Sequence, residues 1–287
     1  MAESPRVAAF FDLDKTIIAK SSTLAFSKPF ASHGLLSKKA LRRALYTQFK
    51  YVLAGADHDQ MLKMRKQMAD LVAGWKVEHV RSIVAETLYS VVEPLVFDEA
   101  VELIATHQAA GHDIVIVSAS GADVVGPIGD MLGADHVIAT TMEVTDEGHY
   151  SGAMSFYAYA ENKAIGMREI AEREGYDLSE SYAYSDSQTD VPMLEAVGHP
   201  FAVNPDKELR RVAVERGWPI LDFTAITGLR SHLPKTPPLR RGATHGSHHS
   251  RSRSSYFRTA GVVGGALLLA LSVTSGRRLW RSGARAH

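Results

Sequence analysis

The chain has 287 residues, 45% of them hydrophobic and 22% charged, which is the composition of a globular protein with a sizeable core. It contains no cysteine, which excludes disulfides, thiolate zinc sites and thiol nucleophiles. The net charge of zero hides an asymmetry, because residues 1–222 hold all 32 acids with 21 cations, a net of −11, and the rest of the chain holds 11 cations. Such a basic arm is typical of contact with an anionic surface, either a membrane or a nucleic acid.

A short apolar run near the start of the chain ends in two acids. The run from Val7 to Phe11 has the length and composition of a buried parallel strand, and Asp12 and Asp14 follow it at once. Two carboxylates held side by side repel each other unless a cation lies between them. The pair therefore indicates either a solvated turn or a metal site that performs chemistry.

The segment after this strand shows apolar residues at helical spacing only. Gly55 and Gly74 interrupt the pattern and are expected to end helices. We therefore assign residues 21–94 to a helical cap inserted after the first strand. Residues 1–20 and 95–225 are assigned to the core domain.

Strand and helix patterns alternate from residue 95 onward. Apolar runs such as DIVIVSAS at 113–120 and SYAYS at 181–185 predict strands, and the segments between them predict helices. Residues 142–154 predict a hairpin with Gly148 near its tip. The alternation is typical of an α/β fold with a doubly wound parallel sheet. The helical cap is then expected over the carboxyl edge of that sheet, where ligands bind in such folds.

The end of the chain differs in composition from the body. Residues 226–258 are rich in Ser, His, Arg and Pro and predict a disordered basic linker. Residues 259–276 carry no charge and are flanked by arginines, which predicts a transmembrane segment slightly shorter than the usual ~20 residues. We therefore expect a cytoplasmic catalytic domain with membrane contact through this segment. Nucleic acid is disfavoured as a partner, because the tail lacks the interleaved aromatic residues that stack on bases.

Several segments of the predicted core place polar groups at the carboxyl end of a strand or at the start of a helix. They are Asp12, Asp14, Ser118, Lys163, Asp186 and Asp190. Taken singly, each group has an ordinary structural explanation, such as a helix cap, a turn or a solvated cation. Taken together and in this order, they indicate one site for phosphoryl transfer.

The chemistry of phosphoryl transfer gives each residue type a role. Asp12 is expected to be a carboxylate nucleophile that accepts the phosphoryl group as an aspartyl phosphate. Asp14 is expected to protonate the leaving alkoxide and later to deprotonate the attacking water. Ser118 and Lys163 are expected to hold the phosphoryl oxygens, because positioning and charge neutralisation supply most of the catalysis.

The acids also predict a magnesium site. Mg²⁺ prefers hard oxygen ligands and binds few protein carboxylates together with a substrate phosphate. We expect Asp12, Asp186 and the backbone carbonyl of Asp14 to be its ligands. Asp190 is expected to be a further ligand or to orient a metal-bound water.

Four pieces of the sequence resemble the motifs of the haloacid dehalogenase (HAD) superfamily in order and spacing. They are FFDLDKT, VIVSAS, Lys163 and YSDSQTD, and the resemblance covers residues 6–222. The helical insertion is similar to the cap of subfamily IB, which contains phosphoserine phosphatase. The resemblance implies a HAD-like Rossmannoid core, the residue roles given above and a bacterial, Mg²⁺-dependent phosphomonoester hydrolase.

Two places depart from the pattern of that family. Ser185 stands where the last motif commonly has glycine. Lys20, Ser21 and Ser22 stand where phosphoserine phosphatases have a glutamate that meets the ammonium group of the substrate. Because a cation here disfavours phosphoserine, another small phosphate ester or a lipid phosphate is also expected as the substrate.

Two other functions are compatible with the same features. A phosphotransferase or phosphomutase would use the same aspartyl-phosphate intermediate, and a non-enzymatic, membrane-tethered binding protein would need only the basic tail. Arg65 and Arg81 in the predicted cap are candidate contacts for a substrate carboxylate or a second phosphate, although solvated helix faces explain them as well.

Overall fold

The computed structural model describes residues 6–36 and 58–226 of the chain. The predicted transmembrane segment at 259–276 lies outside the described residues, and so do the linker beyond residue 226 and residues 37–57 of the predicted cap. None of the helices in the described part is long and apolar enough to cross a bilayer.

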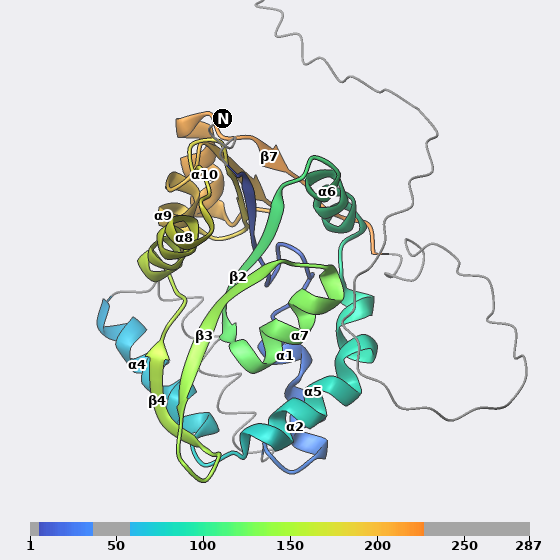
Figure 1. The fold of residues 1–287 in the computed structure, drawn as a ribbon, viewed down its shortest axis with the longest axis vertical. Coiled ribbons are helices and arrows are strands. Elements are labelled where there is room, and N and C mark those ends of the chain that lie inside the picture. The colour runs from blue at the N-terminus through green and yellow to red at the C-terminus, as the bar shows by residue number, and fades with distance from the viewer. Residues whose placement is uncertain (1–5, 37–57, 227–287) are drawn as a thin grey trace, which may run out of the picture. The chain divides into compact units, whose positions relative to one another are not determined.

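One sheet of seven strands organises the described part of the chain, in the order β4-β3-β2-β1-β5-β6-β7 (Figure 1). All neighbouring strands are parallel except β3 and β4, which form an antiparallel hairpin at the edge. The strands are β1 (Ala8–Asp12), β2 (Asp113–Gly121), β3 (His136–Val144), β4 (Tyr150–Phe156), β5 (Tyr182–Ser185), β6 (His199–Val203) and β7 (Ile220–Leu221).

Helices fill the connections between the strands and cover both faces of the sheet (Figure 1). Between β1 and β2, the named elements of the described residues are helices: α1 (Ser22–Ala25), α2 (Ser27–Ser32), α4 (His58–Val72), α5 (Val77–Val92), the short η1 (Glu93–Leu95) and α6 (Asp98–Ala109). The later helices are α7 (Ala122–Leu132), α8 (Glu161–Glu174), η2 (Gln188–Asp190), α9 (Val191–Glu195) and α10 (Lys207–Arg216).

The central strand β1 is buried along its whole length, because it has a parallel neighbour on each side and helices on both faces. Its side chains alternate between the faces, as the pleat of a strand requires. Phe11 stacks on Tyr184 of β5 in the cluster that contains residues of α6 and α7. Phe10 packs in the opposite cluster with residues of α8, α9 and α10. Burial on both faces explains why the strand is apolar without interruption.

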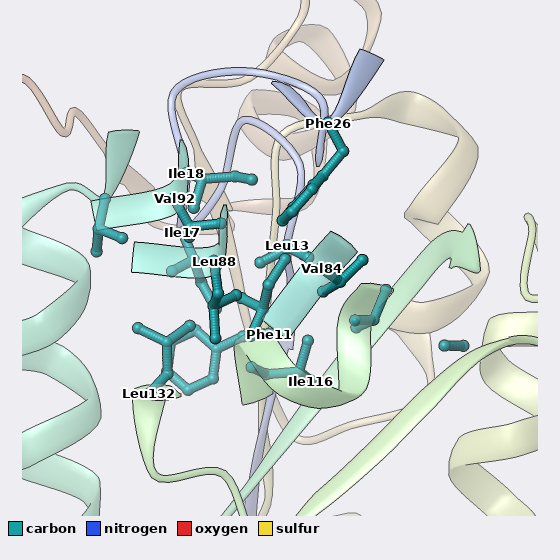
Figure 2. Close-up of a cluster of buried hydrophobic side chains, with 14 of the residues drawn as sticks. Phe11, Leu13, Ile17, Ile18, Phe26, Val84, Leu88, Val92, Ile116 and Leu132 are labelled. Carbon is teal, nitrogen blue, oxygen red and sulfur yellow. The ribbon is translucent and has the colours of Figure 1, made fainter. Parts of the chain in front are cut away.

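Helix α5 packs on the segment that follows β1. Figure 2 shows Val84, Leu88 and Val92 of this helix close to Phe11 and to the apolar residues of the loop at 13–18. These side chains are almost completely buried and belong to one hydrophobic cluster. The helical insertion therefore contacts the part of the chain that carries the first two acids.

The predicted fold class is confirmed by this architecture. The sheet is parallel and doubly wound, and its hairpin spans the segment predicted from residues 142–154, with Gly148 at a positive φ of 77° in the turn. The insertion between β1 and β2 is helical where the structure describes it. The division into a core and a separate cap domain at residues 21–94 stays a prediction.

Candidate active site

The register of the sheet places the predicted site residues at the same edge. Asp12 ends β1, which is paired through Asp12 with Val117 of β2 and through Phe11 with Tyr184 of β5. Ser118 and Ser185 are the next residues along these two neighbours. Because all three strands are parallel, their carboxyl ends converge, and this edge is where ligands bind in such sheets.

A tight loop brings Asp14 back beside Asp12. The backbone amides of Ile17 and Ile18 both donate to the carbonyl of Leu13, and Lys15 adopts a left-handed φ of 68°. The hydroxyl of Thr16 in this loop donates to Oδ2 of Asp12 at 3.2 Å. The loop therefore holds two acids close together at the end of one strand.

Lys163 lies between two of the predicted acids. Its Nζ atom is 2.6 Å from Oδ1 of Asp12 and 2.6 Å from Oδ2 of Asp190, and all three side chains are buried. The hydroxyl of Ser185 also donates to Oδ2 of Asp190, at 2.7 Å. Lys163 and Ser185 thus fix the position of Asp190. Asp190 was predicted to serve the metal, and in the structure it forms an ion pair with the lysine that also contacts Asp12.

The charges of this cluster depend on one another. Burial lowers the pKa of Lys163, but the carboxylates of Asp12 and Asp190 outweigh burial and hold that pKa above its usual value. Burial also raises the pKa of Asp12, and the ammonium of Lys163 opposes the rise. Buried charges of this kind are stable only when they are paired and hydrogen-bonded. Lys163 is therefore the cation that opposes the effect of burial on Asp12, whose pKa still lies above its usual value.

Asp14 is held by two donors. The backbone amide of Ser22 donates to its Oδ1 at 2.7 Å, and the hydroxyl of Ser120 donates to its Oδ2 at 3.0 Å. Burial raises the pKa of Asp14, and the hydrogen bonds from Ser22 and Ser120 act in the opposite direction. The net effect is a raised pKa, and a raised pKa suits a carboxyl group to general acid and base work.

Asp186 directly follows β5 and faces the same edge. Burial raises its pKa to about 7, Lys15 opposes this rise, and the negative charge of Asp190 adds to it. The Nζ atom of Lys15 is 4.0 Å from Oδ2 of Asp186. Lys15 is exposed, so this ion pair compensates the buried carboxylate only weakly.

The donor set at this edge fits a small divalent cation. Asp12 and Asp186 are buried carboxylates with raised pKa values, and the negative charge of Asp186 adds to the rise in the pKa of Asp12. A cation between the two carboxylates would compensate their negative charges and favour their ionised forms. No group of three or more acidic or histidine side chains within the described ranges is placed to hold a metal alone. A Mg²⁺ ion here would therefore take its remaining ligands from the Asp14 carbonyl, water and a substrate phosphate.

Ser118 is buried at the end of the apolar run of β2. Its hydroxyl oxygen accepts a hydrogen bond from the backbone amide of Ser120 at 3.1 Å. The same segment thus carries two serines, one beside the end of β1 and one that contacts Asp14.

The two arginines of the predicted cap have partners away from the acids. Arg81 of α5 donates through Nε to Oδ1 of Asp123 at 2.6 Å, and Tyr150 donates to the other oxygen of that carboxylate. Arg65 of α4 donates to the carbonyl of Met154 at 3.2 Å. Both guanidinium groups thus have structural partners in the described part of the chain.

Three contacts at the site were not predicted from the sequence. They involve the hydroxyls of Ser185, Ser120 and Ser22. Ser185 had been noted only as a departure from glycine, and its bond to Asp190 gives the departure a structural role. Ser120 lies within the VIVSAS motif and Ser22 in the stretch that lacks the glutamate of phosphoserine phosphatases, but only the folded chain places them together.

A parallel α/β sheet that carries buried acids and a buried lysine at its carboxyl edge has the groups that phosphoryl transfer requires. The family model described as haloacid dehalogenase-like hydrolase matches residues 9–195, from β1 to the end of α9. The chain belongs to this family, and the match includes every predicted site residue.

Curated relatives agree with this identification. The "Inhibition of morphological differentiation protein" of Streptomyces azureus is 57% identical over 236 residues, which cover 82% of this chain and 85% of the relative. A probable phosphatase of Mycobacterium tuberculosis is 57% identical over 233 residues, or 81% of each chain. A phosphoserine phosphatase of the same organism is 33% identical over 219 residues, which cover 75% of this chain and 70% of the relative. The predicted resemblance to phosphoserine-phosphatase-like HAD hydrolases is confirmed.

Proposed function

We propose that the protein is a Mg²⁺-dependent phosphomonoesterase that works through an aspartyl phosphate on Asp12. The observation that carries this proposal is the geometry around Asp12, whose carboxylate ends the central strand and lies 2.6 Å from the ammonium of Lys163. The lysine favours the ionised form of the nucleophile and would face a phosphoryl group attached to it. Bound Mg²⁺ would supply a further positive charge that lets an anionic ester approach a carboxylate.

In the first step, a carboxylate oxygen of Asp12 forms a bond to phosphorus while the bond from phosphorus to the leaving oxygen breaks. Asp14 donates its proton to that oxygen, so that an alcohol departs instead of an alkoxide. Lys163 and Ser118 hold the equatorial oxygens, where negative charge is spread in the transition state. Asp190 keeps Lys163 in place by accepting a hydrogen bond from its ammonium, and Ser185 holds Asp190 by donating to the same oxygen.

In the second step, water attacks the phosphorus of the aspartyl phosphate. Asp14 is now a carboxylate and takes the proton of the attacking water. The bond from phosphorus to Asp12 breaks, and inorganic phosphate leaves with the original carboxylate restored. Both steps therefore need Asp14 to be held at a fixed place beside Asp12.

For the substrate, we propose a phosphate ester whose alcohol carries no ammonium group. Lys20 is exposed at the start of the insertion, and Ser22 uses its backbone amide on Asp14, so this stretch offers no acid to an ammonium group. Phosphoserine, the substrate named for one relative, is thus disfavoured against other small esters or a lipid phosphate. Phosphotransferase or phosphomutase activity stays an alternative, which product analysis with an added acceptor alcohol separates from hydrolysis. A purely non-enzymatic binding role is disfavoured by membership of a hydrolase family.

A panel of esters with and without metal tests this function. The full chain is expected to release phosphate from at least one alkyl ester or lipid phosphate with Mg²⁺, and faster than from phosphoserine. Removal of the metal with EDTA is expected to lower the rate by about 100-fold or more, because several kcal/mol of charge stabilisation are lost. Phosphate release is measured with malachite green. Equal rates with Mg²⁺ and EDTA would contradict the metal dependence, and no release from any ester would contradict the function.

We also propose that residues 259–276 attach the catalytic domain to a membrane. This rests on the uncharged run and the arginines that flank it on both sides. Full-length protein in cell membranes is expected to stay in the pellet after a carbonate wash at high pH, because only embedded segments resist it. Complete release into the supernatant would show that the segment is not embedded.

A further inference from the structure

A chain of hydrogen bonds through two serine hydroxyls links the helical insertion to Asp14. The hydroxyl of Ser22 donates to the hydroxyl oxygen of Ser120 at 2.8 Å, and Ser120 donates to Oδ2 of Asp14 at 3.0 Å. The hydroxyl of Thr23 lies 3.2 Å from the same oxygen of Ser120. These serines are 98 residues apart in sequence, so the contact depends on how the insertion packs on the core.

With Asp14 ionised, the hydrogen bonds from Ser22 to Ser120 and from Ser120 to Asp14 run in one direction. A serine hydroxyl has one hydrogen to donate and two lone pairs that accept. Ser120 gives its hydrogen to Asp14 and receives the hydrogen of Ser22, so both donors point toward the carboxylate. Hydrogen bonds aligned in this way polarise and strengthen one another. The carboxylate of Asp14 is therefore held at Oδ2 by an aligned pair of hydroxyls and at Oδ1 by the amide of Ser22.

The two serines of this hydrogen-bond chain are buried, which indicates that their hydroxyls need these hydrogen bonds. The exposed fraction is 0% for Ser22 and 5% for Ser120. A buried hydroxyl costs free energy unless it is hydrogen-bonded. The backbone amide of Ser120 also donates to the hydroxyl of Ser118, so the same residue contacts the predicted phosphate-binding serine. Ser120 therefore joins the acid, the end of β2 and the first turn of the insertion.

We propose that Ser120, supported by Ser22, is a positioning residue that aims the carboxyl group of Asp14 at the leaving oxygen of the substrate. This inference rests on the proposed function, in which Asp14 is the general acid. An acid acts only within hydrogen-bond reach of the atom that it protonates, and small misplacements are costly. Because Ser22 belongs to the insertion, the acid is aligned only while the first turn of the insertion packs against the core.

Two esters that differ in their need for an acid test this role. An alkoxide needs a proton to leave, whereas 4-nitrophenolate leaves without one. The variant Ser120→Ala is expected to lower kcat/KM about 10-fold or more for the most active alkyl ester of the panel and less than about 3-fold for 4-nitrophenyl phosphate. The parameter kcat/KM is used because it reports the steps up to departure of the leaving group. With the alkyl ester, kcat should fall while KM changes less than about 2-fold.

A second variant and a matched control complete the design. Ser22→Ala is expected to act in the same direction with a smaller effect, and the double variant Ser22→Ala/Ser120→Ala should be no worse than Ser120→Ala, because Ser22 acts through Ser120. The matched control is Thr140→Val. It removes a buried hydroxyl that donates to the carbonyl of Ala119, the neighbour of Ser120, and that hydroxyl does not contact Asp14. Its alkyl-to-aryl ratio of kcat/KM should equal that of the wild type.

The outcomes separate this inference from the function on which it rests. An equal fall for both esters, or no fall for either, in Ser120→Ala and Ser22→Ala would overturn the positioning role. A double variant clearly worse than Ser120→Ala would show that Ser22 does not act through Ser120. A wild-type chain that hydrolyses neither ester would instead contradict the proposed function.

Discussion

The variant Asp12→Asn is expected to lower kcat by about 1,000-fold or more with every ester, because the amide cannot form the bond to phosphorus. The change is nearly isosteric, and the amide oxygen can still accept the hydrogen bond from Lys163 that the carboxylate accepts at 2.6 Å. It also removes a buried charge, whose burial is costly. The free energy of unfolding should therefore stay within about 1 kcal/mol of the wild type or increase. Loss of turnover in a stable variant identifies a chemical role for the carboxylate.

Trapping of the intermediate makes this test sharper. Acid quenching during turnover of a ³²P-labelled ester is expected to leave label on the wild-type chain and none on Asp12→Asn. Asp123→Asn is the matched control, because it also converts a partly buried carboxylate, one that contacts Arg81 and Tyr150 instead of the site. This control should keep kcat within about 3-fold of the wild type. Normal turnover by Asp12→Asn would show that another group is the nucleophile.

The edge at which the acids gather could be predicted from the sequence. An uninterrupted apolar run is typical of a strand buried on both faces, and parallel strands bring their carboxyl ends to one edge. Asp12, Ser118 and Asp186 each follow such a run, so their meeting follows from the sheet alone. The register observed between β1, β2 and β5 agrees with this reasoning.

The contacts within the site could not be predicted, because they depend on packing between distant segments. The reach of Lys163 to both Asp12 and Asp190 depends on where α8 begins relative to the sheet. The bond between Ser22 and Ser120 depends on how the insertion packs on the core. Sequence patterns indicate which residues face one element, but they do not specify the geometry between elements.

The structure also changes the interpretation of Lys163. The sequence predicted a phosphate ligand, and the structure places its ammonium between two carboxylates, so its charge is already engaged before any substrate binds. Both roles are compatible, because a phosphoryl group on Asp12 would lie next to the same ammonium. The lysine would then stabilise the fold and the reaction with one charge.

This double role leads to a large expected effect on stability. Lys163→Met keeps most of the volume of the side chain but leaves Asp12 and Asp190 buried without their shared cation. Removal of one partner from a buried ion pair typically costs 3–5 kcal/mol. The free energy of unfolding, measured with urea at pH 8 in metal-free buffer, should therefore fall by about 3–5 kcal/mol. Turnover should be lost as well, because the charge that favours the ionised nucleophile and would neutralise the phosphoryl group is gone.

The pH dependence identifies the cause of this destabilisation. Without Lys163, no ammonium opposes the burial that raises the pKa of Asp12, so this pKa lies further above that of the unfolded chain. The folded state then binds more protons than the unfolded state between these two pKa values, so stability falls as the pH rises through that range. The deficit of Lys163→Met relative to the wild type should be largest at pH 8 and should shrink as the pH is lowered toward 5. A deficit independent of pH would indicate a packing defect instead.

A compensating substitution provides the control. The double variant Lys163→Met/Asp190→Asn removes one of the two buried carboxylate charges that Lys163→Met leaves without a cation. The amide that replaces it can still accept the hydrogen bond from Ser185. It should recover part of the lost stability at pH 8, although each substitution alone removes a native interaction. If the double variant is less stable than Lys163→Met, the two carboxylates do not depend on the lysine for their burial. If the double variant regains stability but not activity, the two roles of Lys163 are separate. Removing a carboxylate charge restores the stability that the lysine provides, but it does not replace the ammonium beside the phosphoryl group.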